Sequence, residues 1–206
     1  HVSRPEIDLP PGFDPHADAV YAKAADSFAA LRQAAPLVLE DAPRFYAYRL
    51  TMGAHTQTGV AGCFSVEEYE TDLIRKHEKT RPDKEDDRTR HVLTLNAHAE
   101  PVFLAYRPVA AVDALVAAAT TATPLYDFTA PDGVRHSLWK VAPADALVRA
   151  FAAVPLSYVA DGHHRSASAW RAGKERRAAN PRHTGDEEYN WFLAVLFPSD
   201  QLHILP

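Results

Sequence analysis

The sequence predicts a single mixed α/β (α+β) domain, residues 1–206, in which helices flank a mixed sheet. Two observations predict this class. Short apolar or alternating runs typical of strands recur between stretches whose apolar residues follow helical spacing. The composition, 47% hydrophobic and 24% charged, is that of a globular protein, and a chain of this length can fold without a disulfide or a structural metal.

In the first half of the chain, capping and turn residues mark where each predicted element begins. Asp14-Pro15 favours a helix over roughly 15–34, because Asp can cap free N–H groups and Pro fits the first helical position. The alternating runs 44–52 and 57–64 predict a β-hairpin. The segment 65–68 has the S-x-x-E spacing of a capping box and predicts a short helix.

The second half alternates strands and helices more regularly. Pro131-Asp132-Gly133 is a turn signal between two apolar runs and predicts a second hairpin. Pro82 and Pro143 each predict the first turn of a helix. The predicted strands are 101–106, 125–128, 134–141, 156–160 and 191–197, and the further predicted helices are 109–119, 143–154 and 166–179.

Charge and cysteine content exclude several classes of protein. The chain has 22 Lys and Arg against 27 Asp and Glu, and its net charge of −5 argues against a nucleic-acid partner. No apolar run approaches the ~20 residues that cross a bilayer, and no signal peptide is visible, so we expect a cytoplasmic protein without a membrane partner. The lone Cys63 excludes an intrachain disulfide, and its place in a predicted strand predicts a buried, inert thiol.

The two ends of the chain predict a fragment of a longer protein. The sequence opens on His1-Val2-Ser3-Arg4 without an initiator Met, and it stops in the apolar run His203-Ile204-Leu205-Pro206. The alternative is a complete domain whose ends were set by processing. The sequence leaves the oligomeric state open.

The segment Asp161-Gly162-His163-His164-Arg165 is the strongest candidate for a functional site. It joins a predicted buried strand to a helix, so backbone N–H groups and the positive end of the helix dipole point at one spot. Phosphate is the usual occupant of such a spot; Gly162 would let it approach the backbone, and Arg165 and Ser166 would add donors. Asp161 could hold a metal or accept a proton. The plainer alternative is that Asp161 caps the helix and both histidines are solvated.

A second candidate cluster is His77-Glu78-Lys79-Thr80-Arg81. It fails as a zinc motif, because H-E-x-x-H needs a histidine where Arg81 stands. As a catalytic loop, Glu78 would be a general base, and His77, Thr80 and Arg81 would orient substrate or phosphate. The charged run that follows, 83–90, is interpreted as a solvated, salt-bridged helix face.

These motifs resemble those of a bacterial and archaeal family, domain of unknown function 1015. Besides the segment 161–165, the resemblance rests on Arg49-Leu50-Thr51-Met52, Gln57-Thr58-Gly59 with Gly62-Cys63, the run from Lys76 to Arg88, and Phe197-Pro198-Ser199-Asp200-Gln201-Leu202. It covers essentially the whole chain. Members of that family are longer at both ends, which agrees with the fragment interpretation, and the family implies no established activity.

The D-G-H-H-R turn also resembles that of a wider group, which includes ParB-type partition proteins, sulfiredoxin and free-serine kinases. Those proteins bind nucleotides with the phosphates at this turn, so the resemblance implies a ParB/sulfiredoxin-like nucleotide-binding core. Sulfiredoxin needs a nucleophilic Cys inside the turn, where this chain has His163. ParB-type proteins carry a helix-turn-helix module after the nucleotide domain, and this sequence stops before one. A small-molecule kinase needs only phosphate binding, a divalent ion and a carboxylate base.

The leading hypothesis is a nucleotide-binding phosphotransferase that uses ATP or ADP with Mg²⁺ and acts on a small hydroxylated metabolite such as an amino acid. The expected roles are phosphate binding by Gly162, Arg165 and Ser166, metal and proton handling by Asp161, His163 and His164, and base catalysis by Glu78. One alternative is a nucleotide-responsive regulatory module without turnover. Another, a hydrolase with a His-bound metal, lacks a ligand spacing in the sequence.

Overall fold

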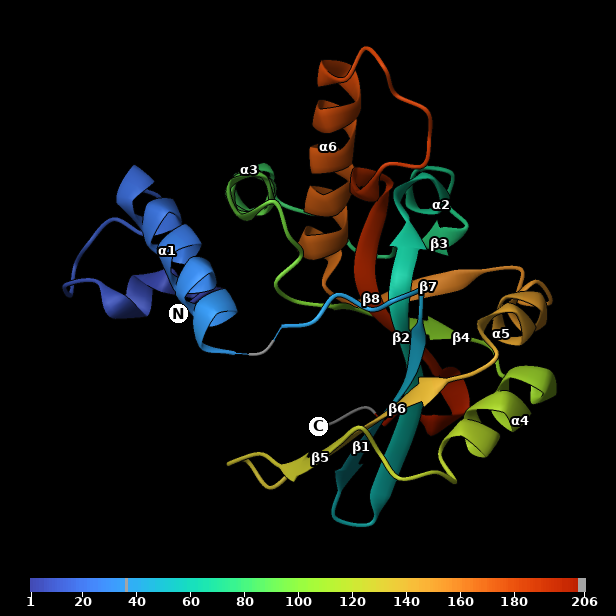
Figure 1. Cartoon of the computed structure of the whole chain (residues 1–206). Helices are drawn as coiled ribbons and strands as arrows, with labels where there is room; N and C mark the ends of the chain where they lie inside the picture. The colour runs from blue at the N-terminus through green and yellow to red at the C-terminus, as the bar shows by residue number, and fades with distance from the viewer. Residues whose placement is uncertain (36, 204–206) are drawn as a thin grey trace.

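The computed structural model of the chain describes residues 1–35 and 37–203, so the last three residues of the apolar C-terminal run lie outside the described part. Its centre is an eight-stranded mixed sheet with the strand order β3-β7-β4-β8-β2-β1-β6-β5 (Figure 1). The strands are β1 Phe45–Met52, β2 His55–Ser65, β3 Ile74–Arg75, β4 Val102–Tyr106, β5 Tyr126–Thr129, β6 Arg135–Val141, β7 Ser157–Asp161 and β8 Trp191–Pro198. The α-helices are α1 Asp18–Ala34, α2 Val66–Glu70, α3 Pro82–Leu95, α4 Ala110–Ala119, α5 Ala144–Phe151 and α6 His163–Ala179, and the 3-10 turns are η1 Pro5–Asp8, η2 Glu188–Asn190 and η3 Ser199–Gln201.

The sheet has two halves that are built differently. Strands β2, β1, β6 and β5, the hairpin half, form an antiparallel ladder. Strands β3, β7, β4 and β8, the site half, mix directions, because β4 runs parallel to β8 and β3 runs parallel to β7. β8 joins the two halves by pairing antiparallel with β2. The predicted mixed α/β fold is therefore confirmed.

Helices cover the two halves unequally. α6 packs on α3 and α2, and α4 packs on α5 beside β6 (Figure 1). α1 packs on α3 and η1, away from the sheet. The faces of β1 and β6 that carry Ala47, Trp139 and Val141 are buried, whereas all four residues of β5 are exposed.

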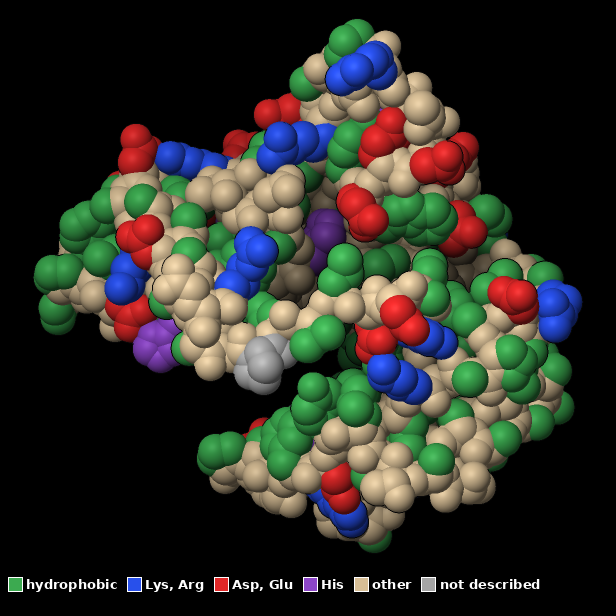
Figure 2. All heavy atoms as spheres, in the orientation of Figure 1, with side chains coloured by type: hydrophobic (Ala, Val, Ile, Leu, Met, Phe, Trp, Pro, Cys, Tyr) green, Lys and Arg blue, Asp and Glu red, His purple; other side chains and the backbone are tan. Residues whose placement is uncertain are grey.

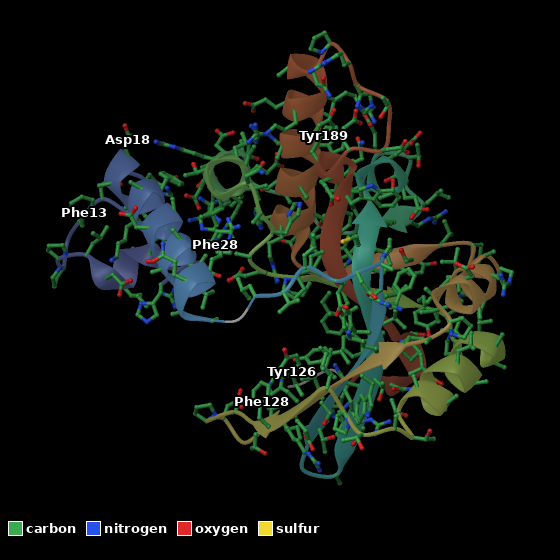
Figure 3. All side chains as sticks on the ribbon, viewed as in Figure 1. Phe13, Asp18, Phe28, Tyr126, Phe128 and Tyr189 are labelled. Atoms are coloured by element: carbon green, nitrogen blue, oxygen red, sulfur yellow. The ribbon has the colours of Figure 1, made fainter. Side chains whose placement is uncertain are left out.

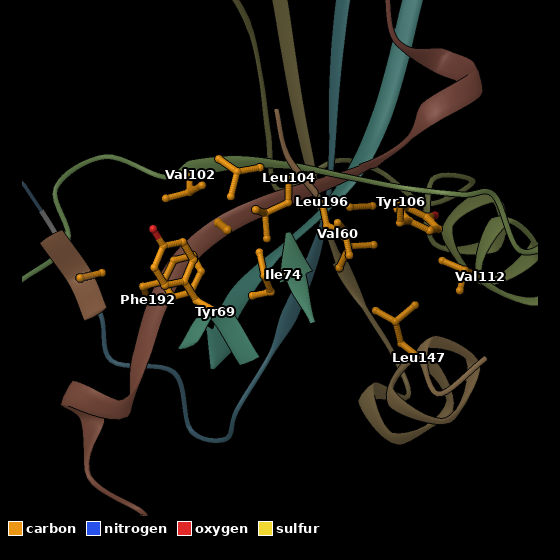
Figure 4. Close-up of a cluster of buried hydrophobic side chains, with 14 of the residues drawn as sticks. Val60, Tyr69, Ile74, Val102, Leu104, Tyr106, Val112, Leu147, Phe192 and Leu196 are labelled. Atoms are coloured by element: carbon orange, nitrogen blue, oxygen red, sulfur yellow. The ribbon is translucent and has the colours of Figure 1, made fainter. Parts of the chain in front are cut away.

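The hydrophobic core lies between the sheet and these helices (Figure 4). Large side chains from β4, β8 and β3 meet those of α4 and α5, and each fully buried aliphatic side chain contributes about 2 kcal/mol through removal from water. The largest fully buried side chains are Tyr106, Phe192, Ile74, Leu104, Leu147, Val60, Val112, Val141 and Val159.

Most predicted elements are confirmed, and their capping signals explain why. The Ser65 hydroxyl accepts hydrogen bonds from the N–H groups of Glu67 and Glu68, as a helix cap should. Around the predicted Pro-Asp-Gly turn, Gly133 adopts a φ of 84°, and its N–H donates to Ala130 O at 2.9 Å.

Three helix boundaries differ from the prediction by three residues, and each has a local cause. α1 begins at Asp18 rather than near 15, because the Asp14 carboxylate accepts the His16 N–H at 2.9 Å and holds a turn ahead of the helix. α5 ends at Phe151 rather than near 154, where two successive turn bonds tighten the chain. α6 begins three residues earlier than predicted, at His163, because Gly162 supplies the helix start without a polar cap.

Candidate functional site

The junction between β7 and α6 leaves a helix N-terminus without a side-chain cap. Asp161 is the last residue of β7, and Gly162 is the N-cap of α6 with a φ of +92°. No side chain in the described part of the chain caps this end, so the first-turn N–H groups remain available to a ligand. The alternative in which Asp161 caps the helix does not match this geometry. The left-handed backbone of Gly162 is one that residues with a Cβ rarely adopt.

The loop that connects β3 to α3 brings the second predicted cluster to this junction. The rings of His77 and His163 meet edge to face with centroids 4.3 Å apart. Glu78 Oε2 lies 3.4 Å from His163 Nδ1. The N–H of Arg81 donates to His164 Nε2 at 3.2 Å. The two clusters, 77–81 and 161–165, are thus brought together, although they are far apart in the sequence.

His163 is the most distinctive side chain of this site. It is only 5% exposed, and its Nε2 has no hydrogen-bond partner among the described residues. Burial, with the neighbouring His77 as a smaller contributor, lowers the pKa of His163 below 6.5 and favours the neutral ring. A buried ring nitrogen without a partner is unfavourable, so a ligand atom placed there would be stabilised.

A cavity of about 580 Å³, which we call the α6 pocket, opens at the junction. Four of its lining side chains are basic and three are acidic, and the helix N-terminus adds positive potential. The lining residues are Glu78, Arg81, Lys84, Arg88, Glu100, Asp161, Gly162, His163, His164 and Arg165. Three predicted site residues, His77, Thr80 and Ser166, lie next to the pocket rather than in its lining.

Two of the residues predicted to bind phosphate are engaged within the protein. Arg165 pairs with Asp161 and donates to the carbonyl of Pro101, and its guanidinium lies against Gly162. Ser166 is fully buried, and its hydroxyl donates to Gly162 O at 3.0 Å and to His163 O at 3.2 Å. In this arrangement Ser166 stabilises the first turn of α6, whereas Arg165 lines the α6 pocket with its charge balanced by Asp161.

Glu85 fastens the β3–α3 loop to α6. Its carboxylate accepts the Thr80 hydroxyl, and Arg171 Nη1 of α6 lies 3.2 Å from Glu85 Oε2. The Ser168 hydroxyl donates to His164 O at 2.6 Å and lies 3.4 Å from Glu85 O. Thr80, predicted to orient substrate, therefore uses its hydroxyl to hold the loop that carries Glu78 against Glu85 of α3.

Lys84, Arg88 and Glu100 line the pocket, but sequence reasoning missed them. The signal was present: Arg81, Lys84 and Arg88 recur at i, i+3 and i+7, which places them on one helix face. The interpretation of residues 83–90 as a solvated, salt-bridged helix face is right about its ion pairs but does not hold throughout, because Thr89 is buried. Three of its acidic residues bind other helices: Glu85 and Asp86 pair with Arg171 of α6, and Asp87 accepts the Tyr21 hydroxyl of α1.

The prediction that Cys63 is a buried thiol was wrong. Alternation along β2 places Val60 and Gly62 in the interior and leaves Cys63 exposed, where it lines a separate cavity of about 380 Å³. Partial burial, with Glu188 nearby, raises the pKa of this thiol above 9.0 and so disfavours the reactive thiolate.

Two further properties concern the described residues as a whole. Within residues 1–35 and 37–203, no three His, Cys, Asp or Glu side chains are grouped so that they could hold a metal ion. None of the helices in that part of the chain has the length and apolar character needed to cross a membrane.

Comparison with known proteins gives one match. The model of the family described as "Protein of unknown function (DUF1015)" matches residues 1–206, the whole of the chain. No curated protein and no solved structure matches the sequence.

Proposed function

The chain belongs to the DUF1015 family, and we propose that it binds a nucleotide in the α6 pocket and transfers a phosphoryl group to a small hydroxylated metabolite. One observation carries the proposal. Among the described residues no side chain caps the N-terminus of α6, which begins at the left-handed Gly162 and opens into a pocket lined by Lys84, Arg88 and His163; the Nε2 atom of His163 is buried and has no partner within this part of the chain. Helix N-termini with neighbouring basic side chains are suited to phosphate.

The phosphates would accept hydrogen bonds from the first-turn N–H groups of α6. Lys84 and Arg88 would neutralise their charge, since no carboxylate within the described residues lies closer than 3.9 Å to either side chain. Arg165 would join them by exchanging its contact with Asp161 for a phosphate oxygen. A Mg²⁺ ion bound to the phosphates would neutralise developing charge, and it needs only one or two protein carboxylates, for which Asp161 and Glu100 are available.

Glu78 would accept the proton of the attacking hydroxyl. Its carboxylate is more than half exposed and lies 3.4 Å from His163 Nδ1, so it faces both the pocket and the buried ring. The hydroxyl oxygen bonds to the terminal phosphorus as the bond to the leaving nucleotide breaks, and the proton passes to Glu78. His163 and His164 would hold Glu78 and the 77–81 loop in place for this step.

Calorimetry on the whole protein tests nucleotide binding. ATP, ADP and CTP are each titrated with Mg²⁺, and at least one is expected to bind. Lys84→Ala should weaken that binding about tenfold, because a charged contact to phosphate is lost. Lys174→Ala is the matched control, since Lys174 pairs with Glu70 away from the pocket. Absence of binding by all three nucleotides would overturn the proposal.

Phosphoryl transfer is tested separately, by phosphorus NMR with a panel of hydroxylated amino acids, sugars and polyols. Glu78→Gln should bind nucleotide as the wild type does and form no phosphorylated product. A wild-type protein that binds nucleotide but phosphorylates no member of the panel would instead be a regulatory module without turnover.

A further inference from the structure

Strand β5 is the last strand of the sheet, and within residues 1–35 and 37–203 no strand pairs with its outer edge. The hydrogen bonds of its turn show which of its residues point their main-chain groups toward that edge. Ala130 N donates to Val134 O and Gly133 N donates to Ala130 O, both at 2.9 Å, so Ala130 and Val134 form a hydrogen-bonded pair. Hydrogen-bonded and non-bonded pairs alternate along an antiparallel ladder. Tyr126 and Phe128 therefore direct their main-chain groups toward β6, and Asp127 and Thr129 direct theirs outward.

The outer edge of β5 is short but lacks several of the usual protections against strand pairing. β5 has the sequence Tyr-Asp-Phe-Thr, without lysine or proline, and all four residues are exposed. Its one charge is already balanced, because Asp127 accepts Arg135 Nε at 2.8 Å and the Ser137 hydroxyl at 3.0 Å. The outward edge is thus polar in its main chain and close to neutral in its side chains.

An aromatic row crosses the hairpin half and stops at this edge. Phe128 stacks on His136 of β6 with ring centroids 5.1 Å apart and planes within 7°. His136 Nδ1 in turn is bonded to the hydroxyl of Tyr48 on β1 at 2.5 Å. Tyr126 and Phe128 are 61% and 57% exposed, and Figure 3 shows both on the β5–β6 hairpin. Figure 2 shows an open notch in the molecular surface in the same view.

We propose that a second copy of this chain pairs antiparallel with β5 about a two-fold axis at Phe128. In this register Asp127 and the partner's Thr129 exchange both main-chain hydrogen bonds, and symmetry repeats the exchange on the other side of the axis. Tyr126 lies opposite the partner's Ala130, a large residue against a small one. Phe128 lies opposite the partner's Phe128, which continues the aromatic row from one copy into the other.

The neighbouring register is disfavoured by charge. Centring the axis on Asp127 would place two carboxylates directly opposite each other, which destabilises a strand pair. An axis at Thr129 would leave the outward groups of Asp127 opposite Pro131, which has no N–H to donate. Among these registers, pairing about Phe128 is the one that uses both outward residues.

Sedimentation velocity on the whole protein tests the proposal. We expect a concentration-dependent dimer, and Thr129→Pro should shift it to monomer with at least about a tenfold rise in Kd. Proline is suited to this test because it removes only an outward N–H, which an edge strand tolerates. Thr129→Val is the control, since it keeps the N–H and should still dimerise. A wild type that stays monomeric up to about 0.1 mM would overturn the proposal.

Cross-linking tests the register independently of affinity. In a Cys63→Ser background, Phe128→Cys should form a disulfide-linked dimer on oxidation, because non-bonded antiparallel pairs bring Cα atoms to about 4.5 Å. Tyr126→Cys should not, since Tyr126 faces the partner's Ala130. Equal cross-linking of both variants would overturn the register and indicate random collision.

Discussion

The two halves of the sheet are held together by different means. The hairpin half consists of two hairpins, β1–β2 and β5–β6, whose strands are neighbours in sequence, and the β1–β6 ladder joins the two hairpins. In the site half, the contacts join distant segments: Arg81 and His164 are 83 residues apart, and Glu85 and Arg171 are 86 apart. The hairpin half is a continuous antiparallel ladder with one buried face, and β5 lies exposed at its edge. The site half depends on side-chain contacts between α3, α6 and the 77–81 loop.

The difference between the two halves indicates which of them is suited to a functional site. The main-chain hydrogen bonds of a ladder are the same for most side chains, so β5 can pair with β6 although all four of its residues are exposed. The α6 pocket has the opposite character, because three segments must meet before Glu78 contacts His163. Substitutions can test whether the two halves respond as differently as this contrast requires.

The largest effect is expected at the core of the site half. Leu104 of β4 is fully buried, so Leu104→Ala removes apolar contacts, leaves a cavity and should lower the free energy of unfolding by about 2–5 kcal/mol. Phe128→Ala on the exposed β5 should lower it by less than about 1 kcal/mol. Urea denaturation, at protein concentrations low enough to keep both variants monomeric, measures the two values. Equal losses would remove the distinction between the halves.

A smaller effect is expected where Glu85 fastens the loop. Glu85→Ala leaves Thr80 and Arg171 without one shared acceptor, and it should lower the free energy of unfolding by roughly 1–2 kcal/mol. It should also weaken nucleotide binding in the α6 pocket. Asp86→Ala, which removes a more exposed partner of the same Arg171, should change stability by less than about 1 kcal/mol. Indistinguishable variants would show that Glu85 does not fasten the loop.

The pH dependence of stability sharpens the contrast further. The pKa of His163 lies below 6.5 in the folded protein, so the unfolded chain binds this proton more readily. The free energy of unfolding should therefore fall as pH drops from about 6.5 through the pKa of His163 in the folded protein. The titratable and charged groups around this ring are His77, His164, Glu78 and Asp161. His163→Gln should reduce the change of the thermal melting temperature with pH in that window. An unchanged slope of melting temperature against pH would mean that other histidines cause the pH dependence.

The smallest effect is expected in the hairpin half, at lower pH. Hydrogen bonds from Arg135 and Ser137 lower the pKa of Asp127 to about 2 from 3.8. Its stabilisation is present above pH 3.8 and is lost as pH falls through about 2. Asp127→Asn should therefore melt slightly below the wild type at neutral pH and together with it near pH 2. A constant difference at every pH would assign the effect to packing instead of charge.

The sequence predicts the hairpin half better than the site half, for a physical reason. Turns and helix caps depend on local residues, so the sequence predicts the β5–β6 hairpin from Pro131-Asp132-Gly133 and the start of α2 from Ser65. The two-residue strand β3 carries no such signal, because it exists only through parallel pairing with β7. Strand order depends in the same way on contacts that no local pattern encodes.

The candidate site follows the same rule. The segments 77–81 and 161–165 could be singled out from residue types alone, and they do meet in the α6 pocket. The sequence did not reveal that Ser166 is buried under its own helix turn or that Glu100 comes to line the pocket from a separate loop. Both depend on how α6 is oriented against β4, which is a tertiary property.

Helix α1 has a consequence for partial unfolding. It packs on α3 and η1 rather than on the sheet, and its polar links to α3 include Tyr21 to Asp87 at 2.6 Å and Asp18 to Arg90 at 2.5 Å (Figure 1). It can therefore detach while the sheet stays intact, and its amides should exchange with solvent before those of β4. Each such opening breaks the contact between Tyr21 and Asp87 and leaves the Asp87 carboxylate free beside Arg88, which lines the α6 pocket. The charge at the pocket would therefore vary with the motion of α1, although no α1 residue is in the pocket lining.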